Sequence, residues 1–288
     1  MDPRASIVVP AHNEAARIEG LLDDLSVLAA RGEVEVVVVC NACTDATAEV
    51  AAGREGIRVV EVPEPGKSGA LNVGDREAGD LFPRFYCDAD VRFEAGAVEA
   101  LVRALDAEGV RAVAPHATHD VAGAGWVVRR FYDALGAPVM ESWVSRHLVG
   151  RGVYGTNRAG RARFGEFPSL IADDLFFDAQ FNDEERVVVD SARVVVPAPP
   201  TVRALVRREV RVAVGNRDLY HHDGRAVDTP HLEVHASSLG GRATNLARST
   251  GLLRVRDVIP LAVHLAVLGT SRVAMRLRSR RDPGPAWR

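Results

Sequence analysis

The sequence lacks the features that mark several common classes of protein. Only three cysteines occur in 288 residues, too few and too scattered for a disulfide scaffold, so a reducing compartment such as the cytoplasm is expected. The net charge is −3 and the pI is near 6.3, which gives no general attraction for nucleic acid. We therefore expect neither a small secreted domain nor a nucleic-acid-binding protein.

Paired cysteines are equally scarce. Cys40 and Cys43 form a CxxC pair, but no second pair follows at the spacing of a zinc finger. Cys40 also falls inside an apolar run that reads as a strand. A redox or zinc role for this pair is therefore disfavoured.

Lysine is almost absent. Of the 36 basic residues, 35 are arginine, and Lys67 is the exception. A compact ammonium and a planar guanidinium differ in shape and hydration, so Lys67 could occupy a place that arginine cannot fill. The alternative is an ordinary surface lysine that survived by chance.

Long apolar runs are also missing. The start of the chain, MDPRAS, offers no apolar signal segment. The longest late apolar stretch, Val258 to Leu268, is interrupted by Pro260 and His264 and is shorter than the roughly 20 residues that cross a bilayer. Because RLRSRR follows at 276–281, the choice lies between a peripheral helix on the inner face of an anionic membrane and a core-packed helix with a solvated basic end.

What is present is an alternation of strand and helix patterns in the first half of the chain. Strands are expected at Ser6–Val9, Glu35–Cys40, Ile57–Val62 and Arg84–Cys87, with helices between them. Asn13 is expected to cap the first helix, and Thr44 or Asp45 the second. Further strands are expected at 187–189 and 193–196, whereas 150–155 reads as a loop. This order predicts a parallel sheet, and ligands of such sheets bind at the carboxyl ends of the strands.

The sharpest local feature lies at one of those strand ends. Asp88 and Asp90 are separated only by Ala89 and follow the strand at 84–87. Two carboxylates in this position can bind Mg²⁺ or Mn²⁺ through oxygen, and such a cation would neutralise a departing diphosphate. Alone, the pattern is weak because acidic pairs are common in turns.

Four segments together are more specific. In order, they read SIVVPAHNEAARIEGLLDDL, VVVVCNACTDATAEVA, GKSGALNVG and FYCDADV. Over about 90 residues they resemble the nucleotide-binding half of family-2 glycosyltransferases. That resemblance implies the GT-A fold, which is an α/β, Rossmann-type αβα sandwich with a mainly parallel sheet.

The resemblance also implies an organisation for the whole chain. Residues 1–200 would form the catalytic domain, with a nucleotide-binding half at 1–115 and an acceptor-binding half at 116–200. Residues 201–288 would form an Arg-rich, mainly helical C-terminal extension.

The same resemblance implies roles for single residues in binding a nucleotide-diphosphate sugar. Those expected near the base, the ribose or the phosphates are Pro10, His12, Asn13, Glu14, Asn41, Asp45, Lys67 and Asn72. Asp88, Ala89 and Asp90 match the motif that binds Mn²⁺ or Mg²⁺ and the diphosphate. Cys40 and Asn41 replace an acidic pair of the family pattern, and an amide can donate as well as accept hydrogen bonds, so the base stays open. A UDP-sugar is our first expectation, and a GDP-sugar is the alternative.

Further along, LIADDLFFDAQF resembles the Glu-Asp motif of the family, with Asp173 in place of Glu and Asp174 aligned with the Asp. In inverting members that Asp is the general base. An alcohol is a poor nucleophile at neutral pH, so a carboxylate that takes its proton assists the attack. Asp173 could raise the pKa of Asp174 by like-charge repulsion. The structural alternative is that both simply cap a helix.

Three other residues are weaker candidates. Arg208 and Arg211 have the spacing of a Gln/Arg-x-x-Arg-Trp motif, but Val212 stands where Trp would be, which disfavours processive synthesis. These arginines could offset phosphate charge. His221 could supply a third metal ligand, although an ordinary surface histidine explains it as readily.

The sequence thus predicts a metal-dependent, inverting glycosyltransferase that acts on an acceptor hydroxyl of a lipid, a glycan or a small metabolite. A sugar-1-phosphate nucleotidyltransferase is the enzymatic alternative, but it should carry a Gly-rich, basic loop after the first strand, where this chain has PAHNE. A non-catalytic nucleotide-binding scaffold is the other alternative.

Overall fold

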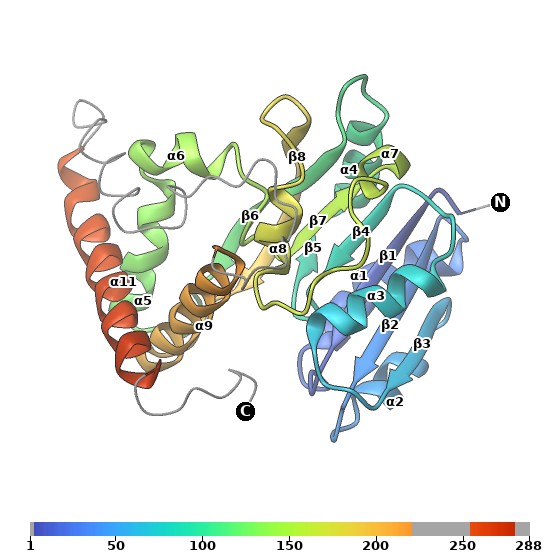
Figure 1. Ribbon diagram of the computed structural model, residues 1–288, viewed down its shortest axis with the longest axis horizontal. Helices are drawn as coiled ribbons and strands as arrows, with labels where there is room; N and C mark the ends of the chain where they lie inside the picture. Colours follow the sequence, from blue (N-terminus) through green and yellow to red (C-terminus); the bar gives the residue numbers. More distant parts are fainter. Residues whose placement is uncertain (1–2, 221–253, 280–288) are drawn as a thin grey trace. The chain divides into compact units, whose positions relative to one another are not determined.

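The computed structural model describes residues 3–220 and 254–279 (Figure 1). The chain forms two compact units. Unit 1 comprises Met1–Thr118, Leu148–Ser169 and Asp173–Val196, and unit 2 comprises His119–His147, Leu170–Ala172 and Pro197–Arg288.

Unit 1 is built on an eight-stranded sheet in the order β3-β2-β1-β4-β7-β6-β8-β5. The pairs β1–β2, β2–β3 and β1–β4 are parallel, whereas β4–β7, β6–β7 and β5–β8 are antiparallel. The strands are β1 (Ala5–Ala11), β2 (Val34–Asn41), β3 (Ile57–Val62), β4 (Arg84–Cys87), β5 (Arg92–Phe93), β6 (Ala112–Asp120), β7 (Val153–Thr156) and β8 (Arg186–Pro197). The predicted α/β architecture is confirmed.

Helices cover both faces of the parallel strands because alternate side chains of a strand point to opposite faces. On one face, Ile7 and Val9 of β1 share a core with Leu22 of α1 (Ile18–Ala30) and Leu101 of α4 (Ala97–Leu105). On the other face lies α3 (Lys67–Glu77), which crosses β1 and β2 in Figure 1. The remaining described helices of this unit are α2 (Thr47–Ala52), α7 (Arg158–Arg161) and α8 (Asp173–Asp178).

A buried ionic cluster ties α3 to the sheet. Asp75 of α3 binds Arg84 Nη1 at 2.8 Å, Arg161 Nη2 at 2.6 Å and Tyr86 Oη at 2.8 Å. Its carboxylate is only 7% exposed. Because every partner donates to one carboxylate, the cluster satisfies charges that would be costly to bury alone.

Unit 2 is helical in its described residues. It contains α5 (Trp126–Asp133), η1 (Ala134–Gly136), α6 (Pro138–Val144), α9 (Val202–Tyr220), η3 (Val255–Asp257) and α11 (Val258–Ser279). Helix α11 packs on both α5 and α9. Their shared core includes Val128, Phe131, Leu205 and Val267.

Helix α11 differs from the prediction. The apolar stretch was expected to end at Leu268, but the helix continues to Ser279, and an 18-residue window within Val255–Leu277 has a mean hydropathy of 1.6. By length and composition alone, this segment could cross a membrane. The prediction that it is too short was therefore wrong, because Gly269 to Leu277 prolong it with only Arg272 and Arg276 as charges.

Local predictions had mixed outcomes. The strands at Ile57–Val62 and Arg84–Cys87 are confirmed. Asn13 does not cap the first helix, which begins at Ile18; it has φ 54° and accepts a hydrogen bond from the Thr44 N–H instead. The expected loop at 150–155 is partly strand β7, and the two strands expected near 187–196 are one, β8.

Candidate active site

The predicted donor-binding residues lie at the carboxyl ends of parallel strands. His12 follows β1, Asn41 ends β2 and Asp88 follows β4. Since β1 pairs with both β2 and β4 in parallel, these ends share one edge of the sheet. The sequence prediction of a site at this edge is consistent with that topology.

Hydrogen bonds join the loops after β1 and β2. His12 Nδ1 lies 2.7 Å from the Asn41 carbonyl oxygen. The Glu14 N–H donates to Thr47 Oγ1 at 2.9 Å, and the Ala15 N–H donates to Asp45 Oδ2 at 3.2 Å. Hydrogen bonding by Thr47 lowers the pKa of Asp45, which therefore remains ionised at neutral pH. The two loops are thus held together by hydrogen bonds and form one continuous surface.

Asn41 connects this surface to α3. In the amide orientation that satisfies its neighbours, Asn41 donates to the Ala11 carbonyl at 2.8 Å and accepts from the Gly66 N–H at 3.0 Å. Gly66 has φ 138°, a conformation that residues with a side chain rarely adopt. The contact fixes the point at which α3 begins and so places Lys67.

Lys67 joins the two acidic motifs. Its Nζ lies 2.7 Å from Asp88 Oδ1 and 2.9 Å from Asp173 Oδ2. Burial alone would lower the pKa of the ammonium, but Asp173 and Asp88 outweigh that effect and raise it. Lys67 is therefore a permanent cation between Asp88 and the helix that carries Asp174.

Asp173 is engaged on two sides. Besides Lys67, the Tyr154 hydroxyl donates to Asp173 Oδ2 at 2.8 Å. The Asp173 side chain is only 5% exposed, and burial together with Asp173 raises the pKa of Tyr154. Tyr154 therefore stays protonated and keeps donating to the carboxylate.

Asp174 has different surroundings. Its Oδ2 accepts from the Gly150 N–H and its Oδ1 from the Leu175 N–H, both at 2.8 Å. Burial and Asp173 raise its pKa to about 6, although Lys67 and the Gly150 N–H act in the opposite direction. A carboxylate with a pKa near neutrality is well suited to accept a proton at physiological pH.

The two aspartates of the Asp-x-Asp motif repel each other and their neighbours. Burial and Asp88 raise the pKa of Asp90, and burial and Asp90 raise the pKa of Glu14. A divalent cation would relieve this repulsion. Among the described residues, however, no group of three Asp, Glu, His or Cys side chains forms a metal site. The donor set fits an ion held by one or two carboxylates and completed by substrate phosphates and water, as is usual for Mg²⁺.

Asn72 has a neighbour that the sequence did not indicate. Its Nδ2 donates to the Phe167 carbonyl at 3.0 Å, and its Oδ1 accepts from the Phe167 N–H at 2.7 Å. This reciprocal pair clamps α3 to the segment that leads toward Asp173. The sequence could not predict the pairing of Asn72 with Phe167, because the two residues are 95 positions apart.

The contacts above do not include the other predicted residues. Arg208 and Arg211 lie on α9 of unit 2, where Arg208 Nη1 is 3.3 Å from the Tyr132 hydroxyl. His221 lies outside the described residues. Pro10 and Ala89 are backbone neighbours of site residues, and Ala89 is buried.

Two contributors to the cluster were not predicted from the sequence. One is the Gly150 N–H that donates to Asp174. A backbone group of this kind cannot be predicted from a pattern of side chains. The other is the Tyr154 hydroxyl on Asp173, which was not foreseen because residues 150–155 were expected to form a loop.

The CxxC pair has no reactive thiolate at Cys40. Burial and the neighbouring Cys43 raise the pKa of the Cys40 thiol to about 12. Both cysteines are free.

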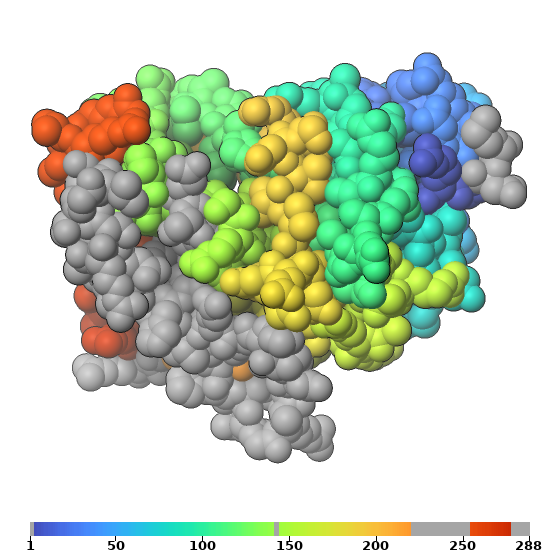
Figure 2. All heavy atoms as spheres, turned by 90° about the horizontal axis from the view of Figure 1, so that it is seen from above, coloured from blue at the N-terminus to red at the C-terminus, as the bar shows by residue number. Residues whose placement is uncertain are grey.

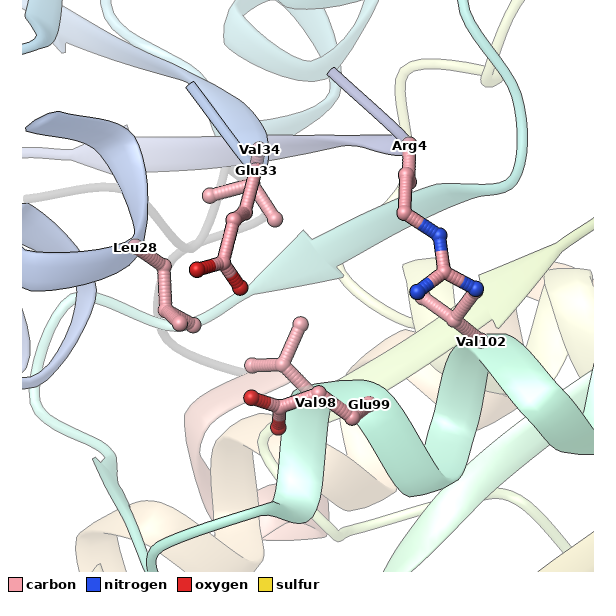
Figure 3. Close-up of a pocket in the computed structure, with 7 residues that line it drawn as sticks. All are labelled: Arg4, Leu28, Glu33, Val34, Val98, Glu99 and Val102. Carbon is pink, nitrogen blue, oxygen red and sulfur yellow. The ribbon is translucent and has the colours of Figure 1, made fainter. Parts of the chain in front are cut away.

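A small pocket opens near the amino ends of β1 and β2, the ends opposite to the acidic motifs (Figure 3). It is lined by Arg4, Leu28, Glu33, Val34, Val98, Glu99 and Val102. None of the predicted site residues belongs to it.

Known proteins resemble this chain in sequence and in fold. Residues 6–145 match the family model described as glycosyl transferase family 2. No curated protein sequence matches the chain. Among solved structures, the mannosyltransferase PcManGT from Pyrobaculum calidifontis, in complex with GDP-Man and Mn²⁺, is 22% identical over 96% of this chain and 88% of that one, with a TM-score of 0.66.

Two other solved structures are similar. Glucosyl-3-phosphoglycerate synthase from Mycobacterium tuberculosis, with Mn²⁺, UDP-glucose and phosphoglyceric acid, is 25% identical over 65% of this chain and 70% of that one, with a TM-score of 0.50. S. aureus TarS 1-349 is 15% identical over 96% of this chain and 92% of that one, also with a TM-score of 0.50. At these identities the mannosyltransferase and TarS support the fold alone.

Proposed function

Because residues 6–145 match the family model of glycosyl transferase family 2, we propose that the protein transfers a sugar from a nucleotide-diphosphate sugar to an acceptor hydroxyl, with inversion at the anomeric carbon. The observation that carries this proposal is the chain of contacts from Asp88 through Lys67 to Asp173, next to Asp174. It joins a diphosphate-binding motif to a carboxylate suited to act as a base.

On the donor side, Asp88 and Asp90 would hold Mn²⁺ or Mg²⁺, which would act as a Lewis acid on the diphosphate leaving group. Lys67 sits within hydrogen-bonding distance of Asp88 and adds a fixed positive charge there. Arg208 or Arg211 would supply further charge to the phosphates. Such preorganised charges stabilise the negative charge that develops on the leaving group.

On the acceptor side, Asp174 is our general base. Its pKa of about 6 keeps most of the carboxylate ionised at pH 7 while leaving it basic enough to take a hydroxyl proton. Two backbone N–H groups fix both of its oxygens. The proton of the acceptor hydroxyl would pass to Asp174 as the oxygen attacks the anomeric carbon, and the nucleotide diphosphate would leave from the opposite side in the same displacement.

Asp173 receives a different role from that of Asp174. Its carboxylate already binds Lys67 and Tyr154, so it is poorly placed to take a proton. We assign to it the positioning of Lys67. It also contributes to the raised pKa of Asp174.

The nucleoside would lie on the surface formed by Pro10, His12, Asn13, Glu14, Asn41 and Asp45, with Asn72 holding α3 beside it. A UDP-sugar remains the first candidate, and a GDP-sugar is the alternative. The solved structures with UDP-glucose and with GDP-Man make both worth testing. The free cysteines favour the cytoplasm as the compartment.

The donor proposal is tested by thermal shift with a panel of UDP- and GDP-sugars, with Mn²⁺ and with EDTA. A ligand that binds only the folded chain raises the melting temperature. Asp88→Ala should abolish the Mn²⁺-dependent shift, and Asp80→Ala, which changes an aspartate that is 91% exposed, should preserve it. If Asp88→Ala retains the full shift, the metal assignment is wrong.

Inversion has its own test. With water as the acceptor, ¹H NMR of the released sugar should first show the anomer opposite to that of the donor. Initial release of the donor's own anomer would refute the single displacement.

A further inference from the structure

Helix α11 has an unusual distribution of side chains. Its exposed residues include Val258, Ile259, Val273 and Leu277, each more than half exposed. Its buried residues include the polar His264 and Ser271, at 2% and 1% exposure. Leu261 and Val267 of the same helix are also buried, so α11 is apolar on its inner and outer sides, whereas the outer side of a helix on a water-facing surface is normally polar.

The buried polar side chains are satisfied inside unit 2. His264 Nδ1 lies 3.2 Å from the Phe131 carbonyl oxygen, and its ring stacks on Phe131 at 4.3 Å. Ser271 donates to the Val267 carbonyl at 2.9 Å. The His264 contacts reach α5 and orient α11 within unit 2, whereas the Ser271 bond lies within α11 itself.

The outward side forms a mainly apolar stripe, which we call the α11 stripe: Val258, Ile259, Ala262, Ala266, Val273 and Leu277, interrupted by the exposed Thr270. Spacings of three, four and seven place these residues on one face of a helix. No Asp, Glu, Lys or Arg occurs between positions 258 and 271, a length of about 21 Å. The atoms of α11, orange-red in Figure 2, lie at the molecular surface in that view.

Arginines flank both ends of the stripe. Arg254 and Arg256 precede it, and Arg272 and Arg276 lie near its other end. Burial and Arg276 lower the pKa of Arg272, so two positive charges one turn apart repel each other.

Positive charge is concentrated in the part of the chain that contains α11. Residues 197–288 hold 16 arginines and 7 acidic residues, a net charge of +9, whereas residues 1–196 carry −12. An apolar stripe with basic ends is the pattern of helices that lie in a membrane interface. A second copy that met the first stripe to stripe would bring two basic regions together, which disfavours that occupant.

We propose that the α11 stripe docks on the surface of a membrane that contains anionic lipid. The aliphatic side chains enter the boundary between headgroups and acyl chains, and the flanking arginines bind lipid phosphates. The helix lies in the plane of the membrane instead of crossing it, because its other face is packed on α5 and α9. Docking would bring the enzyme to an acceptor that resides in or on the lipid surface.

The test is sedimentation of the full chain with vesicles of phosphatidylcholine alone and with about a third phosphatidylglycerol. The double variant Ile259→Glu/Val273→Glu should lower vesicle binding roughly tenfold or more. Val27→Glu is the matched control, since Val27 is 52% exposed on α1, and it should bind like the wild type. Arg254→Gln should weaken binding to the anionic vesicles roughly fivefold and leave phosphatidylcholine unaffected.

Several results would overturn the proposal. These are absence of vesicle binding by the wild type, equal binding by the double variant, and resistance of the bound protein to carbonate extraction, which would indicate a spanning helix. If light scattering shows a dimer of the wild type and only a monomer of the double variant, the stripe is instead an interface between two copies of the chain. Circular dichroism and the Mn²⁺-dependent thermal shift of the double variant verify that it is folded.

Discussion

The pKa of Asp174 predicts the pH dependence of transfer. If Asp174 is the base, kcat/KM should follow its ionised fraction. With a pKa of about 6, half of the carboxylate is ionised at pH 6 and roughly a tenth at pH 5. We therefore expect kcat/KM to fall about tenfold from its plateau near pH 8 to pH 5.

The fall of kcat/KM at low pH, the acidic limb of the pH profile, should move in opposite directions when different neighbouring charges are removed. Asp173 raises the pKa of Asp174 and Lys67 lowers it. Asp173→Asn should therefore shift the limb to lower pH, and Lys67→Met should shift it to higher pH, whatever either change does to the plateau. Two opposite displacements are hard to obtain from general damage to the site.

Asp174→Asn should abolish transfer without unfolding the chain. The ordinary pKa of an aspartate is 3.8 and the folded value is about 6, so ionised Asp174 costs about 3 kcal/mol of stability above pH 6. This cost fades as the pH falls through 6 toward 3.8. The amide removes that cost but leaves one of two backbone N–H donors without an acceptor, which costs about 1 to 3 kcal/mol. The two effects nearly cancel at neutral pH.

The assay is release of nucleotide diphosphate from the identified donor between pH 5 and pH 8.5, at saturating Mn²⁺. Repeating the profile at two Mn²⁺ concentrations separates Asp174 from Asp88 and Asp90, because only a limb due to metal binding moves with the ion. A flat profile to pH 5, or near-normal transfer by Asp174→Asn, would refute the assignment of the base.

Three further predictions concern affinity and stability. Lys67→Arg should weaken donor binding in calorimetry on the order of tenfold, because a planar guanidinium cannot replace an ammonium held between two carboxylates. Asp75→Ala should lower the free energy of unfolding by about 3 to 5 kcal/mol in urea, because it leaves buried Arg84 without its carboxylate, whereas Asp80→Ala on the surface should change it little. Gly155→Ala should lower the free energy of unfolding by about 1 to 3 kcal/mol, because the added Cβ would lie 2.1 Å from Phe85 Cδ1 and 2.9 Å from the Arg84 carbonyl oxygen. Gly69→Ala in α3 is the control: its Cβ would meet no atom within 4 Å, so this change should stabilise the fold slightly.

The parallel half of the sheet was readable from the sequence because its strands are buried on both faces. Runs such as Val36 to Val39 leave little ambiguity. Strand β7 was harder, because Gly152 and Gly155 resemble turn residues. Gly155 is instead required by the close approach of Phe85 from the neighbouring strand, a contact between distant parts of the chain.

The acidic residues of the site were also identifiable, because carboxylates at strand and helix ends form a local pattern. Their partners were not. The contacts of Asp173 with Lys67 and Tyr154, and of Asn72 with Phe167, depend on tertiary packing. The length of α11 was underestimated for a related reason: Pro260 and His264 look disruptive in the sequence, but the former lies in the first turn of the helix and the latter is bonded to α5.

The position of Lys67 also has a practical consequence, since it is the single side-chain amine in 288 residues. Reagents that acylate amines attack the neutral form, and its two carboxylate neighbours keep that form scarce. A ligand that draws Asp88 away would expose a more reactive amine, whereas one that covers it would protect it. Acylation at Lys67, located by peptide mass mapping after a brief exposure to the reagent, could thus report whether a ligand occupies the site around Asp88 and Asp173.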